Sequence, residues 1–500
     1  MLKGLARLSP AVWVTGERVF SQVFWLAVFV VQAKMLGPYA FGLVSIVMAF
    51  IGFWEGVPGI AMTDALISIR DIDDKHFSVV TMACVIFCLL FGAAIIGFAH
   101  PLATMLGDNT LVPIIQVLAI LPLIQCFSVA PTAAAQRGMQ FQSVTIRTVA
   151  SLLAGGAVGL ALAALGAGVW ALVWQALVQR FVASIVLWFA VPISFNLKPS
   201  WRHFRDVAQF AIPVMIARTM SWGEGQIPRL VLGVSLGASN LGIFNLGARL
   251  NDIVGQITVG PRALVARVDL RRFSANQEAL AKAVRRVFQQ ISILCFPLCV
   301  GGAAVVPTLF KVWLDRRWLE GIVPAEMLLL MGIPYVTYFV AAAVLLAMNR
   351  QKSEAIVSTV QTLSILVAVA ASARFGLTAV SVVLAVRSVL VLPLPILIMH
   401  RQCHLRLRDT IAPQVRPLIA ACGMGVPVIF LRRWFNAAGL DDAISLIVLV
   451  VTGVILYAVL TVVMMPKPII RARKRLVSSL VTGLIASLRA RRILRPVGTE

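Results

Sequence analysis

Charged residues are scarce in this chain of 500 residues. Only 13% of the residues are charged and 60% are hydrophobic, whereas soluble proteins carry about 25% charged residues. Acidic residues are the scarcer kind, with 20 Asp and Glu against 44 Lys and Arg. This composition excludes a cytosolic enzyme, a disordered scaffold and a conventional nucleic-acid-binding domain.

The sequence also lacks the signatures of enzymes and metal centres. Its seven Cys residues form no CxxC framework for disulfides or zinc, and no HExxH, GxSxG or P-loop motif is present. The stretch Asp71-Ile72-Asp73-Asp74 could hold Mg²⁺ on a pyrophosphate, but a solvated turn is the simpler interpretation. We therefore expect no enzymatic activity, no cofactor and no metal site.

Long apolar runs fill most of the chain, and its mean hydropathy is +0.93. A bilayer core of about 30 Å needs roughly 20 apolar residues per helix. The runs predict an all-α polytopic membrane protein with about 14 transmembrane helices. Their approximate limits are 12–33, 40–62, 78–99, 112–133, 146–165, 168–191, 207–235, 240–261, 288–310, 325–348, 355–373, 377–399, 414–431 and 443–465.

The seventh predicted span, 207–235, is unusually long, and its two prolines and two of its glycines are expected to interrupt a continuous helix. They are Pro213, Gly223, Gly225 and Pro228. This pattern predicts a broken helix, which a membrane protein tolerates where the break faces protein or a wet cavity.

The basic residues predict the orientation of the spans. With the N-terminus in the cytoplasm, the cytoplasmic loops and tails hold several times as many Lys and Arg residues as the opposite loops. This asymmetry places both termini inside and accounts for most of the net charge of +24 without a nucleic-acid partner. Two basic amphipathic segments, 262–290 and 469–494, are expected to lie on anionic membrane lipids.

An internal repeat appears at an offset of 200 residues. The segments 36–42 and 236–242 both have the pattern LG-x4-G between two spans, and Arg18 and Ser21 align with Arg218 and Ser221. Because an even number of spans separates the copies, the repeats are parallel. The predicted domains are an N-lobe at 1–191 (spans 1–6), a cytoplasmic linker at 192–206, a C-lobe at 207–399 (spans 7–12), two further helices within 400–465 and a basic amphipathic cytoplasmic tail at 466–500.

Ionisable residues within the spans point to a functional cavity, because charges in a membrane are costly and face protein or water. Cations outnumber anions among them, and helical spacing places several in polar stripes on spans 1, 7 and 8. Arginine is a forked donor suited to phosphate and carboxylate, although snorkelling or internal pairing remains an alternative for each single residue. The candidates for substrate binding are Arg18, Gln22, Arg218, Ser221, Arg229, Asn245, Arg249 and Gln256, and those for ion coupling are Glu17, Glu224 and Asp252.

Five short motifs resemble those of bacterial polysaccharide transporters, the Wzx-like flippases. In order they are LGPYAFG at 36–42, ALI before Arg70 and Asp71 at 65–71, QRGMQF at 136–141, GVWALV at 168–173 and LGASNLGIFN at 236–245. The resemblance implies the multidrug/oligosaccharidyl-lipid/polysaccharide exporter superfamily, whose fold has two parallel six-helix lobes and, in many members, two further helices.

The resemblance also implies a function. Such a flippase translocates undecaprenyl-pyrophosphate-linked oligosaccharide across the cytoplasmic membrane for exopolysaccharide or lipopolysaccharide assembly, with a polysaccharide polymerase and glycosyltransferases as further partners. A cation-coupled multidrug exporter of the same superfamily is an alternative, but the excess of arginine in the spans disfavours cationic cargo. A membrane glycan polymerase or acyltransferase is a second alternative, disfavoured because no outer loop is long enough to carry a catalytic cluster.

The topology prediction can be tested by cysteine labelling. Single cysteines in the predicted outer loops should react with an impermeant maleimide added to intact cells, because those loops face outward. The positions are Gly107, Gly166, Ala238 and Leu440. Cysteines in place of Gly138 or Ala275 should react only after the cells are opened, and their labelling from outside would contradict the orientation.

Overall fold

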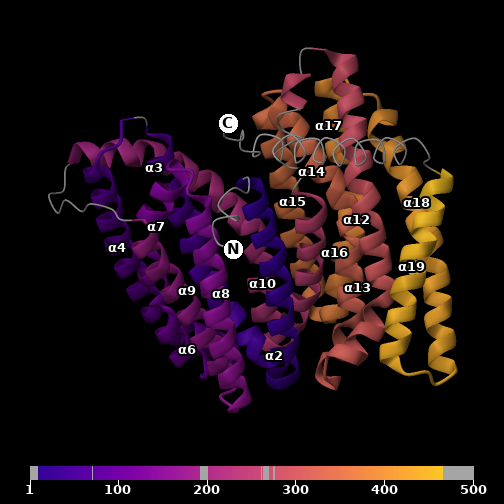
Figure 1. The fold of residues 1–500 in the computed structure, drawn as a ribbon, viewed down its shortest axis with the longest axis horizontal. Helices are drawn as coiled ribbons and strands as arrows, with labels where there is room; N and C mark the ends of the chain where they lie inside the picture. The colour runs from indigo at the N-terminus through magenta and orange to yellow at the C-terminus, as the bar shows by residue number, and fades with distance from the viewer. Residues whose placement is uncertain are drawn as a thin grey trace, which may run out of the picture. The chain divides into compact units, whose positions relative to one another are not determined.

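The computed structural model describes residues 10–69, 71–191, 201–260, 262, 270–273 and 276–464. The regular elements of this part of the chain are all helices (Figure 1). The first group is α2 (Pro10–Trp54), the π-helix η1 (Glu55–Gly59), α3 (Ile60–Ser68), α4 (Asp74–Gly97), α5 (Ala99–Leu106), α6 (Leu111–Leu118), α7 (Leu121–Arg137), α8 (Phe141–Ala164), α9 (Val169–Ala190) and α10 (Trp201–Thr258).

The second group follows α10 in the chain. It comprises α12 (Gln277–Trp313), the 3-10 helix η2 (Arg316–Gly321), α13 (Ile322–Leu330), α14 (Gly332–Ala347), α15 (Gln351–Ser372), the 3-10 helix η3 (Ala373–Phe375), α16 (Leu377–Leu390), α17 (Pro393–Cys403), α18 (Leu407–Ala437) and α19 (Asp442–Met464).

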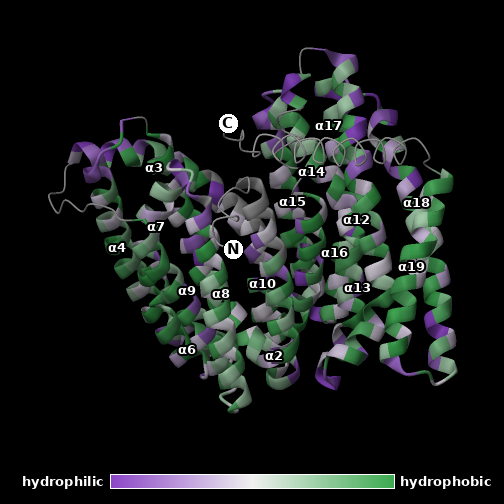
Figure 2. Ribbon diagram, in the orientation of Figure 1, coloured by the Kyte–Doolittle hydropathy of each residue, from purple (hydrophilic) through white to green (hydrophobic). Residues whose placement is uncertain are grey.

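The predicted fold class, an all-α polytopic membrane protein, is confirmed. Among the described residues, 12 helical stretches are long and apolar enough to cross a membrane. Hydrophobic residues cover most of the length of helices such as α4 and α19, and hydrophilic residues gather near helix ends (Figure 2). One stretch, Phe20–Ser68, covers most of the first predicted span and all of the second, and the number of 14 spans stays a prediction.

The predicted break within the seventh span is wrong. Helix α10 continues through Pro213 and Pro228, and it departs from helical angles at Gly237, with φ 81° and ψ 173°. Transmembrane helices tolerate proline because neighbouring groups can satisfy the freed backbone carbonyls. Helix α2 has the same interruption at Gly37, with φ 73° and ψ 173°. Only glycine adopts such angles readily, so the two LG-x4-G motifs mark the true breaks.

These two glycine turns contact each other through their backbones. A Cβ atom on Gly42 would lie 1.7 Å from the carbonyl oxygen of Ala238, and one on Gly242 would lie 2.0 Å from the carbonyl oxygen of Pro38. Pro38 and Ala238 occupy the same position in the repeated motif. The contact is therefore reciprocal, and neither glycine can accept a side chain without moving the opposite backbone.

Helix α8 packs against α9 and α2 (Figure 1), and glycines lie at both contacts. A Cβ on Gly155 would meet Gln179 of α9 at 2.8 Å, and a Cβ on Gly156 would meet Phe24 of α2 at 2.8 Å. Small residues permit this close approach, which supplies packing energy between helices in a membrane.

The chain divides into two compact units. The first contains the described residues of Met1–Ile253, Leu309–Met331 and Gln351–Leu394. Within it, the buried Trp318 donates from Nε1 to the carbonyl oxygen of Ala33 at 2.9 Å, which fixes η2 to the first leg of α2. The predicted lobes follow the sequence repeat, and their boundaries stay a prediction.

The second unit contains the described residues of Val254–Thr308, Gly332–Arg350 and Pro395–Glu500. Its helices α18 and α19 pack together. Arg432 donates to the carbonyl oxygen of Ala304 at 2.8 Å, and Tyr457 donates to that of Ile293 at 2.7 Å. The predicted tail at 466–500 and part of the basic segment 262–290 lie outside the described residues.

The reciprocal glycine contact predicts a strong effect of a single methyl group. Gly42→Ala should destabilise the protein by about 3 kcal/mol or more, because the methyl group collides with backbone rather than with a movable side chain. The measurement is the thermal unfolding of purified protein in detergent. Gly255→Ala is the control, because its Cβ would enter open space within α10; equal melting temperatures for the two variants would refute the contact.

Candidate functional site

Arg249 of α10 has contacts that distinguish it from the other intramembrane arginines. Its guanidinium carbon lies 4.0 Å from the centroid of the Trp25 ring, and it donates to Oε1 of Gln22 at 3.3 Å. Gln22 and Trp25 lie one turn apart on α2. The Nε atom of Arg249 is buried without a hydrogen-bond partner among the described residues, so this cation has a donor available for a further acceptor.

Three other arginines that the sequence places within the spans of the first unit pair with carboxylates. Arg180 binds Glu55 at 2.7 Å and Arg218 binds Asp64 at 2.9 Å. Arg229 lies 3.9 Å from Asp252, both on α10. These ion pairs neutralise much of the charge that the sequence assigns to the cavity. The direct contacts of Arg249 are an amide and an aromatic ring, while Asp252 and Arg229 act on it electrostatically.

Other candidates occupy varied surroundings. Glu17 accepts a hydrogen bond from Ser21 at 3.1 Å, and Nδ2 of Asn245 is buried without a partner among the described residues. Gln256 is exposed and belongs to the second unit. The side chains of Arg18, Ser221 and Glu224 lie outside the described residues. The structure therefore joins Gln22 with Arg249 and Arg229 with Asp252, while a cavity shared by Arg18, Arg218 and Arg249 stays a prediction.

Sequence reasoning missed two charged residues of the first unit. Asp64, the partner of Arg218, lies just beyond the predicted end of the second span. Arg147 of α8 donates to Oγ1 of Thr132 at 3.3 Å and interacts electrostatically with Arg180. Both residues fall at span edges, where hydropathy does not separate loop charges from membrane charges. A margin of one helical turn would have included Asp64, whereas Arg147 already lies at the start of the predicted span 146–165.

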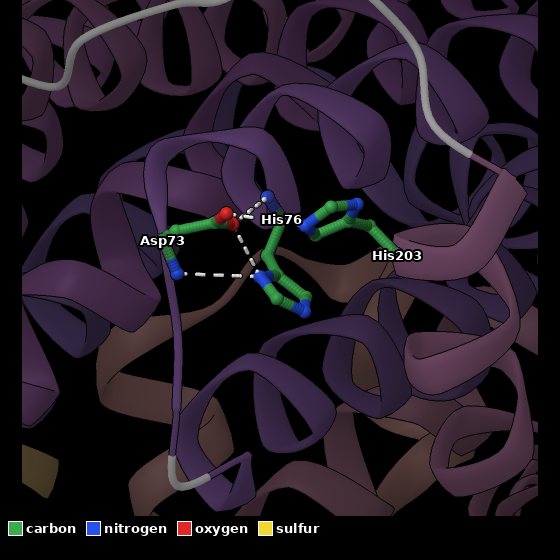
Figure 3. A group of neighbouring side chains, drawn as sticks. All are labelled: Asp73, His76 and His203. Atoms are coloured by element: carbon green, nitrogen blue, oxygen red, sulfur yellow. Dashed lines mark hydrogen bonds and ion pairs between the residues drawn. The ribbon is translucent and has the colours of Figure 1, made fainter.

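A second polar cluster joins the start of α4 to the start of α10 (Figure 3). Asp73 caps α4, accepting from the backbone N–H of His76 at 3.2 Å, while the His76 Nδ1 atom lies 2.6 Å from Asp73 Oδ1. The Nε2 atom of His203 lies 3.1 Å from Asp73 Oδ2, and the two imidazole rings stack edge to face at 4.5 Å. Asp73 is thus more than the solvated turn residue that the sequence suggests.

The surroundings of Asp73 act on its ionisation. Burial raises the pKa of the Asp73 carboxyl, but hydrogen bonds with His76 and then His203 outweigh burial and hold that pKa below its usual value of 3.8. The ligand atoms of the three side chains also lie within 4.8 Å of one another, close enough to hold a metal ion. Helix capping and ring packing account for the cluster without an ion, and the expected absence of a metal site stays a prediction.

Known proteins share sequence features with this chain. A family model described as polysaccharide biosynthesis protein matches residues 31–323. The succinoglycan biosynthesis transport protein ExoT of Rhizobium meliloti (strain 1021) is 22% identical over 288 residues. That match spans 58% of this chain and 58% of ExoT, so a little over half of the relative is represented.

Solved structures share the fold. The lipid II flippase MurJ, in an inward closed conformation, matches with a TM-score of 0.73 and 14% identity, over 91% of this chain and 99% of MurJ. An inward-facing multidrug resistance MATE family transporter of the MOP superfamily matches with a TM-score of 0.60 and 15% identity, over 78% of this chain and 96% of that one. At these sequence identities the similarity shows a common fold. The molecule that this chain binds has to be inferred from the side chains of its own site.

The Asp73 cluster predicts a pH dependence of stability. Because the folded-state pKa of Asp73 is lowered, its ionised form contributes stability above pH 3.8, and that stability is lost as the pH falls through the folded pKa. Asp73→Asn keeps a capping side chain but removes the charge. Melting temperatures of the variant should therefore fall less than those of the wild type between pH 6 and about 3.

Asp71→Asn is the matched control, because Asp71 is an exposed carboxylate of the same loop. It should follow the wild-type curve. If Asp73→Asn and the wild type lose stability in parallel as the pH falls, the carboxylate does not couple α4 to α10.

Proposed function

This chain belongs to the family of polysaccharide biosynthesis proteins, and from that premise we propose that it is a flippase for lipid-linked oligosaccharides. Its cargo is an undecaprenyl-pyrophosphate-linked repeat unit, moved across the bacterial cytoplasmic membrane for exopolysaccharide or lipopolysaccharide assembly. Both termini lie in the cytoplasm. Its partners are the lipid-linked oligosaccharide, membrane lipids, and the glycosyltransferases and polymerase that make and consume that cargo.

The environment of Arg249 carries this proposal. A partly buried guanidinium that contacts Gln22 and Trp25, with Nε unpartnered among the described residues, has unused capacity for an anion. A pyrophosphate oxygen would form charge-assisted hydrogen bonds with this guanidinium group, whose N–H donors are arranged as a planar fork. A cation in a membrane is costly, and a head-group anion would lower that cost beyond what the electrostatic interaction with Asp252 already does.

The direction of transport follows from the charge of the cargo. A cell interior that is electrically negative repels an anionic head group outward. At about 2.3 kcal/mol per charge per 100 mV, a head group of charge near −2 gains roughly 4–5 kcal/mol on leaving. This gain supports export without ATP, and it leaves the acids Glu17, Glu224 and Asp252 as candidates for coupling to an ion.

The paired carboxylates weigh against the alternative of a cation-coupled multidrug exporter. Glu55, Asp64 and Asp252 each lie beside an arginine, whereas a cationic drug would need an acid that is not already compensated. A membrane polymerase or acyltransferase has less support, since the relative ExoT is a transport protein.

The proposal predicts the phenotype of Arg249 variants. Arg249→Ala should weaken capture of the head group about 10- to 100-fold, the equivalent of one charge-assisted hydrogen bond, and should lower surface polysaccharide. Arg249→Lys should rescue only in part, because lysine keeps the charge but loses the fork. The measurement is surface polysaccharide per cell at matched protein levels.

Arg374→Ala is the matched control. Arg374 also stacks on an aromatic ring, with its guanidinium carbon 4.8 Å from the Phe375 ring centroid, but it is exposed and lies in the predicted outer loop. It should give wild-type output. Normal output from Arg249→Ala would rule out the arginine as the head-group site.

A further inference from the structure

A cavity of about 240 Å³ lies between α2 and α9 in the first unit. Its lining combines two kinds of side chain. Trp25, Phe29 and Phe41 supply aromatic surface, and Gln32, Gln175 and Gln179 supply amides. No residue that lines this cavity, all of them in the described part of the chain, is ionisable.

This lining suits a neutral, hydroxyl-rich ligand. A side-chain amide offers both donors and acceptors, as sugar hydroxyls require, and an aromatic ring packs against the apolar C–H face of a pyranose. A lipid tail fits poorly, because it would bury the amides without hydrogen-bond partners. An ionised ligand fits poorly as well, because the lining offers it no opposite charge.

The amides are held in place by the surrounding helices. Gln32 of α2 donates from Nε2 to Oε1 of Gln175 on α9 at 2.5 Å. A Cβ on Gly159 of α8 would lie 2.3 Å from that Oε1 and 2.6 Å from that Nε2. Because Gly159 has no side chain, the amide pair can occupy this space. Each amide keeps further hydrogen-bonding capacity toward a ligand.

The cavity adjoins the Arg249 site through a shared side chain. Gln22, Trp25, Phe29 and Gln32 follow one face of α2 at helical spacing. Trp25 stacks beneath the Arg249 guanidinium and also lines the cavity. A ligand with an anion at Arg249 would therefore bring its adjoining group to the mouth of this cavity.

We propose that this cavity is a subsite for one neutral sugar, the residue attached directly to the pyrophosphate. The inference rests on the proposed function and names the part of the cargo that the α2–α9 cavity recognises. The volume is just below the roughly 300–1,000 Å³ of pockets for drug-sized ligands, which is appropriate to a single monosaccharide. Its uncharged lining selects a neutral hexose over a uronic acid.

Binding measurements on the full chain in nanodiscs test the subsite with three probes. These are undecaprenyl pyrophosphate alone, the same lipid carrying one neutral hexose, and the same lipid carrying one uronic acid. The wild type should bind the neutral glycolipid more tightly than the bare lipid by about two- to tenfold, the effect of one or two hydrogen bonds. The uronic acid should give no such gain.

Two variants should remove this preference without changing affinity for the bare lipid. Gln179→Leu deletes an amide that lies outside the Gln32–Gln175 pair, and Gly159→Ala forces the pair to move. Gln142→Leu, at an exposed position of α8, is the control and should keep the preference. Gln179→Leu alone decides the test if Gly159→Ala does not fold.

The outcomes separate the subsite from the proposed function. Equal binding of the bare and glycosylated lipids by the wild type, or an unchanged preference in Gln179→Leu, overturns the sugar subsite while head-group binding stands. A wild type that binds none of the probes overturns the proposed function as well. Arg249→Ala should weaken binding of all three probes, since it acts on the head group that they share.

Discussion

The carbonyl oxygens of Pro38 and Ala238 lie where the side chains of Gly242 and Gly42 would begin. This reciprocal contact sets the second leg of α2 beside the second leg of α10, because the contacting residues directly follow Gly37 and Gly237, the glycines at which the two helices break. Helix packing in a membrane depends on such close approach rather than on a hydrophobic driving force. The meeting of Arg249 with Gln22 and Trp25 depends on this arrangement of backbones.

Charge pairing then decides which cations in the first unit are available to a ligand. Arg180, Arg218 and Arg229 lie beside carboxylates, and a paired arginine has less attraction left for an external anion. Arg249 contacts a neutral amide and a ring, both of which keep its charge while holding its position. The unpartnered Nε of this positioned cation is the feature on which the proposed binding of an anionic head group rests.

The same fold occurs in a lipid II flippase and in a multidrug transporter, so the helices provide a scaffold on which different cargo sites are built. In this chain the differences lie on a few helix faces. One face of α2 runs from Gln22 to Gln32 and joins the cation to the amide-lined cavity. Asp73 joins the start of α4 to the start of α10 through His76 and His203, which is a further link between helices of the first unit.

The sequence by itself determined the membrane class, the helical segments and the glycine turns. Apolar length is decisive because a chain in lipid must satisfy its backbone hydrogen bonds locally, and positive φ is open chiefly to glycine. Only the tertiary structure decided that Arg218 meets Asp64, 154 residues away, and that Arg249 meets Gln22, 227 residues away. It also kept α10 helical through Pro213 and Pro228. Sequence periodicity indicates which face of a helix is polar. The residues that this face contacts depend on which helices pack together, and the packing depends on side-chain fit across the whole unit.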